Sequence, residues 1–195
     1  METIRLEESQ DALALTAAVV AAQRQFAQRL RQRTVPDPLT GLPVRSLLID
    51  RLEHALAAAG PHTGRLAVLC CTLDGITVLE DLHGAAVADA ARAEAGGRLV
   101  ASVRQGDVVA RISAQTFVLL CPGVPERADA EGIARRVAAA FDETLRPRPG
   151  IEHRVRISVG VALSGHASTP ASLIASANGA MTRIRHERQG SGRHG

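Results

Sequence analysis

Residues 108–122 read VVARISAQTFVLLCP, and this stretch decides the fold. It holds two apolar runs of strand length, joined by a tight connection around Ser113 and Ala114. Two such runs with so short a connection predict an antiparallel β-hairpin. The flanking sequence adds two more strand-like segments. Residues 65–73 (RLAVLCCTL) are a short apolar run, and residues 154–164 (RVRISVGVALS) alternate so that one face carries Val155, Ile157, Val159 and Val161.

Helical patterns separate these strands. The first predicted helix carries Leu47, Leu48, Leu52 and Leu56 on one face and ends at Gly60. Further helices are expected over residues 85–104, 127–145 and 171–185, with a short helix or loop over 74–83, a break over 147–150 and a frayed tail over 190–195. The order β-α-α-β-β-α-β-α predicts an α+β layered sandwich and disfavours a doubly wound sheet.

An N-terminal helix is expected to precede this domain, over residues 7–33. Its apolar stripe covers about two heptads, which fits either a helix packed on its own domain or a dimerising stalk. Two prolines, Pro36 and Pro38, then end it. We therefore divide the chain into an N-terminal helix (1–35), a main domain (36–188) and a disordered tail (189–195).

Composition excludes several classes of function. The chain has 195 residues and a formal net charge of +3, and all 23 of its Lys+Arg positions are arginine. Without lysine there is no Walker A loop and no Schiff-base lysine. Three phenylalanines, with no tyrosine or tryptophan, cannot build an aromatic platform for single-stranded nucleic acid. Because the net charge is modest and the arginines are scattered, we expect no nucleic acid polymer as a partner.

The three cysteines, Cys70, Cys71 and Cys121, have no metal-ligand spacing, and two of them lie in an apolar run. They fit buried core residues of a protein in a reducing cytoplasm, with redox sensing as the alternative. No segment is apolar enough over sufficient length to span a membrane, and the acidic N-terminus does not suit a signal peptide.

Five segments in the expected order resemble the GGDEF domains of the diguanylate cyclase family. DPLTGLPVR (37–45) is similar to the opening signature D-x-LTGLxNR, and LCCTLDGITVLEDLHGAAVAD (69–89) is similar to LDxDxFKxINDxxGHxxGD. VARISAQTF (109–117) resembles the strand-turn-strand that carries GGDEF. VRISVGVA (155–162) and ANGAMTRIR (177–185) resemble the last strand and helix, so the likeness covers roughly residues 36–188.

The resemblance implies a nucleotidyl-cyclase-like (ferredoxin-like) fold, with a central mixed β-sheet flanked by helices. In active members two subunits each hold one GTP and join the two into cyclic di-GMP. Carboxylates hold Mg²⁺, which neutralises the phosphates and activates the attacking hydroxyl.

The sequence departs from the family pattern where this chemistry takes place. SAQT stands where the family reads GGDE, so Ser113 and Ala114 replace two glycines, and Gln115 and Thr116 replace two acids. The other metal-binding aspartate of the family falls on Thr72. Neutral side chains are poor ligands for a hard cation. We therefore expect no metal, no cofactor, no catalytic residue and no cyclase activity.

The positions that the family uses for guanine and phosphate are altered as well. The guanine-reading asparagine falls on Glu80, whereas the guanine-reading aspartate is retained as Asp89. One phosphate-side lysine falls on Thr77, and the other keeps its charge as Arg185. Asp74, Asp81 and Asp89 could regroup as a new metal site, but surface acids on a helix are the commoner explanation.

One family feature is intact. Arg104-Gln105-Gly106-Asp107 is an RxxD sequence at the spacing of the family's inhibitory product site. The resemblance implies that Arg104 and Asp107 bind cyclic di-GMP together with a second arginine, Arg136, although Arg135 is the alternative. Arginine can bond guanine or phosphate and can stack on a purine. An ordinary ion pair at the end of a helix is the simpler interpretation of the same two residues.

The sequence therefore predicts a catalytically inactive, cytoplasmic GGDEF domain that acts as a cyclic di-GMP receptor. One alternative is a protein-interaction module that forms a homodimer, or a heterodimer with another signalling protein, without nucleotide binding. A second alternative is residual diguanylate cyclase activity.

Overall fold

The computed structural model describes residues 35–59 and 65–191. The described residues from Pro36 onward form one compact unit. The predicted helix over residues 7–33 lies outside the described residues, so the choice between a packed helix and a dimerising stalk stays open. Within the described ranges, no helix combines the length and apolarity that crossing a membrane requires.

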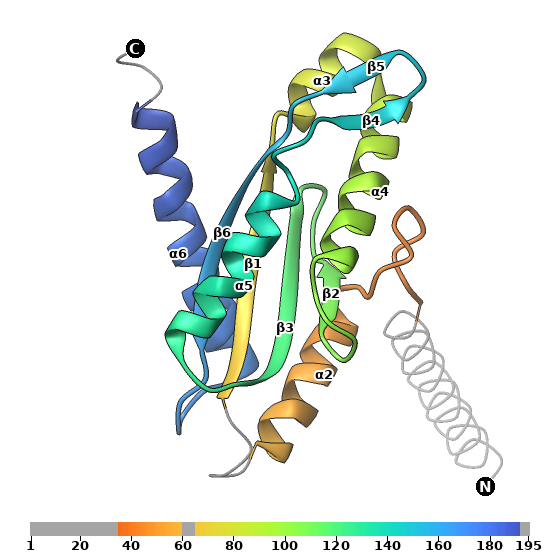
Figure 1. The fold of residues 1–195 in the computed structure, drawn as a ribbon. Helices are drawn as coiled ribbons and strands as arrows, with labels where there is room; N and C mark the ends of the chain where they lie inside the picture. The colour runs from red at the N-terminus through yellow and green to blue at the C-terminus, as the bar shows by residue number, and fades with distance from the viewer. Residues whose placement is uncertain (1–34, 60–64, 192–195) are drawn as a thin grey trace, which may run out of the picture. The chain divides into compact units, whose positions relative to one another are not determined.

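The core of the domain is a four-stranded sheet in the order β2-β3-β1-β6 (Figure 1). Its strands are β1 (Arg65–Asp74), β2 (Val108–Arg111), β3 (Thr116–Val124) and β6 (Arg156–Leu163). The hairpin predicted from residues 108–122 is confirmed as β2 and β3, with Arg111 opposite Phe117. The three strand pairs are antiparallel, and parallel pairing among the described residues is limited to isolated bridges such as Val44 with Arg111.

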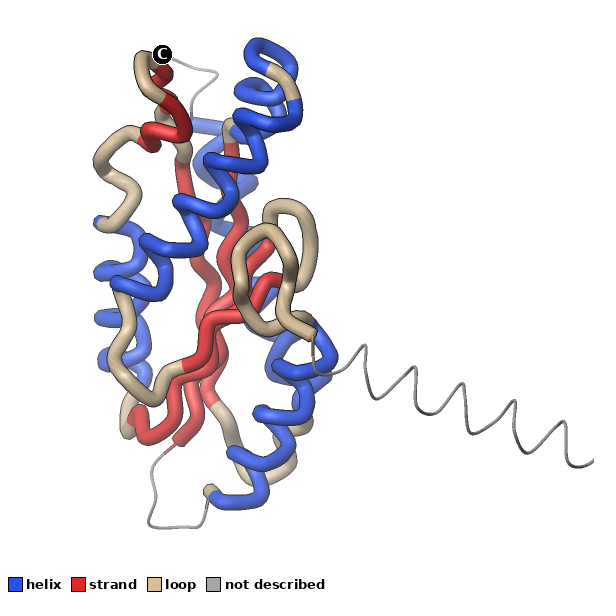
Figure 2. The backbone as a smooth tube through the Cα atoms, turned by 90° about the vertical axis from the view of Figure 1, so that its right-hand side faces the viewer, coloured by secondary structure: helices blue, strands red, loops and turns tan. Residues whose placement is uncertain are grey.

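Helices cover both faces of this sheet (Figures 1 and 2). Because side chains alternate along a strand, β1 sends Leu69 and Cys71 into one core and Val68 and Cys70 into the other. The first core is closed by α3 (Ile76–His83), α4 (Ala85–Ala101) and α5 (Arg127–Ala139), and the second by α2 (Arg45–Ala58) and α6 (Pro170–Ser191). The predicted α+β class and helix-flanked sheet are confirmed.

Several predicted boundaries were wrong, each for a local reason. The helix expected over 127–145 ends at Ala139, and the expected break belongs to a second hairpin, β4 (Leu145–Arg148) and β5 (Ile151–His153). Leu145 is buried in the core, and Gly150 has a left-handed φ of +79° that only glycine adopts readily. The helix expected over 85–104 ends at Ala101, where the Ser102 hydroxyl donates to the Leu99 carbonyl.

The ends of β1 and of α6 also differ from prediction. Asp74 belongs to β1, and α3 begins only after Gly75, which has a φ of +103°. The last helix extends to Ser191, so residues 189–191 are not part of a disordered tail as predicted. Arg188 donates to the Ile157 carbonyl at 2.6 Å, which ties the final turns of α6 to the sheet.

The cysteines are buried core residues. Burial raises the pKa of Cys70 to about 11 and that of Cys121 to about 12, and the pKa of Cys71 is raised well above its ordinary value for the same reason. Thiols with such pKa values remain protonated near neutral pH, and a protonated thiol is a poor nucleophile. These properties favour the core interpretation over redox sensing.

Contact between α6 and β6 depends on Gly160. A Cβ atom at this position would lie 2.0 Å from the Met181 backbone nitrogen and 2.2 Å from the Ala177 carbonyl oxygen. Backbone atoms cannot move aside as the end of a flexible side chain can. The helix therefore packs directly on the strand backbone, and any side chain at Gly160 would push the two elements apart.

We expect Gly160→Ala to lower the free energy of unfolding by about 1–3 kcal/mol, the usual cost of an overpacked core. Gly97→Ala is the matched control, because nothing lies within 4 Å of a Cβ built at that position in α4. Alanine there should raise stability by about 0.5–1 kcal/mol through helix propensity. Urea unfolding followed by circular dichroism measures both changes. Equal effects of the two substitutions would contradict this account of the α6 contact.

Candidate functional site

The turn between β2 and β3 is held in place by Arg111. Its Nη1 donates to both carboxylate oxygens of Asp37, at 3.0 Å and 2.9 Å, and its Nη2 donates to the Ala114 carbonyl at 3.3 Å. Asp37 also accepts hydrogen bonds from the backbone nitrogen and the hydroxyl of Thr40. Arg111 thus joins the loop that begins the domain to the turn at residues 112–115.

The pKa of Asp37 reflects these contacts. Partial burial raises the pKa, but hydrogen bonds from Thr40 and Arg111 and the charge of Arg111 outweigh burial. The net effect is a pKa below the ordinary value of 3.8, so the folded state favours the ionised carboxylate.

The residues at the expected metal positions come together at the ends of β1 and β3, as a neutral group. Thr72 lies opposite Thr116 across the strand pair, and Thr72 is only 4% exposed. Gln115 follows the turn, accepts from the Leu73 backbone nitrogen through its own carbonyl, and donates from its side-chain amide to the Thr77 hydroxyl at 3.0 Å. This group offers hydroxyl and amide oxygens and no carboxylate.

The turn itself adopts ordinary backbone angles. Among the described residues, only glycines have a positive φ, so Ser113 and Ala114 avoid the left-handed region. Their side chains are exposed at the tip. Ser113 and Ala114 therefore introduce no backbone strain here, and the change from glycine is the bulk that each Cβ adds at the tip of the turn.

Glu80 and Asp89, the two positions expected to read guanine, are linked by a residue that the sequence analysis did not single out. Arg92 donates through Nη2 to Glu80 at 2.5 Å and through Nη1 to Asp89 at 2.7 Å. The Arg92 side chain is 9% exposed. Burial lowers its pKa, but the hydrogen bonds and charges of Glu80 and Asp89 outweigh burial, so the pKa lies above its ordinary value. The sequence did contain a signal for this bridge. Arg92 lies three residues after Asp89 on the apolar side of a helix, and a buried guanidinium requires carboxylate partners.

The RxxD residues form a compact loop after α4. The Arg104 Nε donates to one oxygen of Asp107 at 3.2 Å, and the Arg104 backbone nitrogen donates to the other at 3.1 Å. The Arg104 Nη2 also donates to the Pro122 carbonyl. As a result the Asp107 side chain is only 1% exposed, whereas the Arg104 side chain remains 59% exposed.

Arg136 lies beside this loop. Its Nε donates to the Ser102 carbonyl at 2.6 Å, two residues before Arg104. Burial above all, and then the charge of Asp107, raise the pKa of Cys121, whereas the charges of Arg104 and Arg136 lower it. Of the two candidate arginines on α5, Arg136 is the one that donates a hydrogen bond to the segment that leads into the RxxD loop, and its role in binding stays a prediction.

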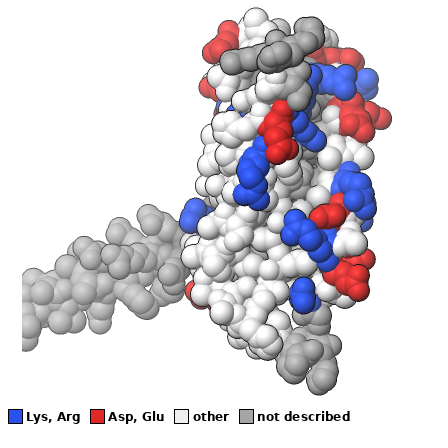
Figure 3. Space-filling view, turned by 90° about the vertical axis from the view of Figure 1, so that its left-hand side faces the viewer, with Lys and Arg blue, Asp and Glu red and all other residues white. Residues whose placement is uncertain are grey.

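The remaining acidic positions do not assemble into a metal site. Asp74 pairs with Arg185 at 2.7 Å and Asp89 pairs with Arg92. No group of three His, Cys, Asp or Glu side chains suited to a metal ion occurs in residues 35–59 and 65–191. Figure 3 shows basic and acidic side chains side by side along one part of a molecular face, with neutral surface over the rest.

Comparison with known proteins identifies the family. The sequence profile for "Diguanylate cyclase, GGDEF domain" matches residues 34–191. The chain belongs to the GGDEF family. It is 33% identical over 158 residues to the diguanylate cyclase TpbB of Pseudomonas aeruginosa, covering 80% of this chain and 36% of that protein. It is 35% identical over 171 residues to the bifunctional diguanylate cyclase/cyclic di-GMP phosphodiesterase MucR of the same species, covering 86% and 24%.

Solved GGDEF domains share the fold. A structure comprising only the GGDEF domain of TpbB matches with a TM-score of 0.74 at 32% identity, covering 78% of this chain and 89% of that one. The chain spans 36% and 24% of the lengths of TpbB and MucR, so it corresponds to the GGDEF signalling domain of such proteins.

We expect Asp37→Asn to lower the free energy of unfolding by about 1–3 kcal/mol at pH 7, because the Arg111 guanidinium loses its ionised partner. The folded pKa of Asp37 lies below its unfolded value, so its stabilisation is present above about pH 4 and is lost as the pH falls through the folded pKa. The difference between wild type and variant should therefore shrink at about pH 2.5.

Denaturant unfolding at the two pH values provides the measurement. Asp50→Asn is the matched control, because Asp50 is exposed and pairs only with His54 at 3.7 Å. A gap between wild type and Asp37→Asn that stays constant with pH would show that the ionised carboxylate is not what stabilises the turn.

Proposed function

We propose that this GGDEF domain is catalytically inactive and binds cyclic di-GMP through Arg104, Asp107 and Arg136. The observation that carries the proposal is the arrangement of the Arg104 side chain. Two contacts fix its position, yet more than half of its surface faces solvent beside a second arginine. A guanidinium that is held in place before a ligand arrives loses little conformational entropy on binding.

Catalytic inactivity is supported by the neutral group at the expected metal positions. Phosphoryl transfer to join two nucleotides needs cations to neutralise the charge on the phosphates. Thr72, Gln115 and Thr116 carry no charge to hold such cations, and the Gln115 amide is already bonded to Thr77. Hard divalent cations prefer carboxylates, so a site of hydroxyls and an amide binds them poorly.

Weak GTP binding is supported by the contacts of Arg92. The carboxylates of Glu80 and Asp89 both accept hydrogen bonds from its guanidinium. A guanine base would have to break these charge-assisted bonds before it could use either carboxylate, and bonds of this type are roughly twice as strong as neutral ones.

Two arginines on separate elements suit the chemistry of a cyclic dinucleotide. Arg104 follows α4 and Arg136 lies on α5, so their planar groups could contact a purine or a phosphate from two sides. Asp107 is almost fully buried, and both of its oxygens accept hydrogen bonds from Arg104. In this arrangement Asp107 positions Arg104, and it reaches a guanine edge itself only if that ion pair opens.

Isothermal titration calorimetry with cyclic di-GMP should show a Kd of about 1 μM or tighter. Arg104→Ala should weaken binding at least about tenfold, because a hydrogen bond to a charged group contributes about 1.5–3 kcal/mol. Arg127→Ala is the matched control, since Arg127 is an exposed arginine whose partner is Glu131 on its own helix. Absence of heat with wild type at high ligand concentration would reject the receptor function and leave a protein-interaction role.

Incubation of the purified chain with GTP and Mg²⁺ or Mn²⁺ should yield no cyclic di-GMP by chromatography. An active diguanylate cyclase assayed in parallel serves as the positive control. Product formed by the wild-type chain would contradict catalytic inactivity and would require a cation site other than the one that the family uses.

A further inference from the structure

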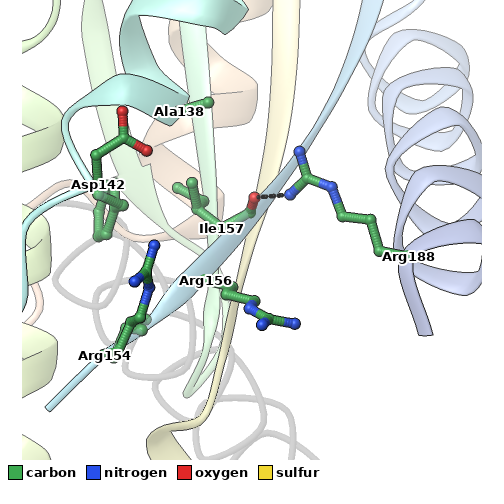
Figure 4. Close-up of a pocket in the computed structure, with 8 residues that line it drawn as sticks. Ala138, Asp142, Arg154, Arg156, Ile157 and Arg188 are labelled. Atoms are coloured by element: carbon green, nitrogen blue, oxygen red, sulfur yellow. Dashed lines mark hydrogen bonds between the residues drawn. The ribbon is translucent and has the colours of Figure 1, made fainter. Parts of the chain in front are cut away.

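A second basic site lies away from the RxxD loop. A pocket of about 120 Å³ opens between the end of α5, the start of β6 and the end of α6 (Figure 4). Its lining includes Phe141 and Asp142 from the α5 side, Arg154 and Arg156 from the β6 side, and Arg188 from α6. None of the lining residues belongs to the RxxD loop or to the turn at residues 113–116.

Positive charge exceeds negative charge around this pocket. Three arginines and one aspartate line it. No carboxylate oxygen in the described part of the chain lies within 4 Å of the guanidinium of Arg154 or Arg156, whereas Arg127 and Arg146 on the same domain both have a Glu partner. Asp142 is the one carboxylate in the lining, and Asp74, which lies opposite Arg156 across the β1–β6 pair, is already bonded to Arg185. The three arginines therefore leave a net positive charge at the pocket.

The third arginine is fixed in place. Arg188 reaches from α6 and donates through Nη1 to the Ile157 carbonyl at 2.6 Å, as Figure 4 shows. In the same view Arg154 rises on the other side of Ile157 toward the end of α5. Arg188 retains donors that the Ile157 carbonyl does not use.

The volume limits what the pocket can hold. About 120 Å³ equals the share of liquid volume of about four water molecules. Pockets for drug-sized ligands are about 300–1,000 Å³, so a nucleotide base with its sugar does not fit inside this pocket. A tetrahedral oxyanion does, and arginine forks are the donors that match its oxygens.

We propose that this pocket binds a phosphate group, either as free phosphate or as the phosphate of a small monoester. Arg154 and Arg188 contact its oxygens from two sides, and Arg156 adds positive charge at the rim. Asp142 opposes the bound dianion, because like charges at short range disfavour each other. The site is separate from the proposed cyclic di-GMP site, and either can fail without the other.

Thermal unfolding of the full chain tests the proposal, with inorganic phosphate as the probe and sodium chloride added to keep the ionic strength constant. A ligand that binds only the folded state raises the Tm with concentration. We expect phosphate to raise the Tm beyond chloride, and the double variant Arg154→Gln/Arg156→Gln to weaken the apparent affinity at least tenfold. Arg127→Gln should keep the wild-type response, because Arg127 is exposed and pairs with Glu131 on its own helix.

Asp142→Asn gives an opposite and independent readout. Removing the opposing charge should tighten phosphate binding severalfold, whereas a loss of structure around the pocket would weaken it.

Calorimetry with phenyl phosphate beside inorganic phosphate separates a monoester from the free ion as the ligand. Tighter binding of the ester assigns the site to a monoester, and weaker binding assigns it to the free ion. A phosphate response no larger than that of chloride, or one that survives in the double variant, would overturn the proposal.

Discussion

The groups at the expected metal and nucleotide positions depend on the central strand β1. The strand is hydrogen-bonded to β3 on one side and to β6 on the other, and eight consecutive residues from Leu66 to Leu73 are buried. A strand that is paired on both edges and covered on both faces cannot shift register without moving both cores. Its end therefore fixes where Thr72 and Asp74 lie, and Gly75 then starts α3 with its Thr77 and Glu80. The neutral group, the Arg92 bridge and the Asp74–Arg185 pair are all set by that one strand end.

Charge in this domain is arranged as internal pairs. Where the family pattern has acids for a metal, this chain has hydroxyls and an amide. Its remaining acids near the expected nucleotide position contact arginines, as in the Glu80–Arg92–Asp89 bridge and the Asp74–Arg185 pair. Such pairs compensate buried or half-buried charge, and breaking one by removing a single partner is costly. The chain has arginine and no lysine, and this suits such pairs, because a planar guanidinium can bridge two carboxylates at once.

The sequence predicted the parts of the fold that have strong periodicity. The alternation of Val155, Ile157 and Val159 and the tight turn after Ile112 were sufficient for β6 and the β2–β3 hairpin. The hairpin of β4 and β5 was missed because its strands are very short, and because Pro147 in β4 and Pro149 in the turn together indicate a break in the chain. Helix ends were misplaced where a tertiary contact decides them, as at Arg188. Of the candidate site, the RxxD loop was predictable from its spacing. The burial of Asp107 depends on how the Arg104 side chain folds over it, and the bridge of Arg92 depends on Glu80, twelve residues away, so neither could be predicted from the sequence.

The position of Arg188 also bears on how this domain coexists with other copies of itself. β6 is an edge strand of the sheet, and an unpaired edge exposes backbone groups to which a strand of another molecule can add. The guanidinium of Arg188 occupies the Ile157 carbonyl near the start of that edge, and two further arginines stand close by. An approaching strand would meet an occupied acceptor and a concentration of like charge. The same residues that shape a small pocket thus make this border of the sheet less suited to strand addition.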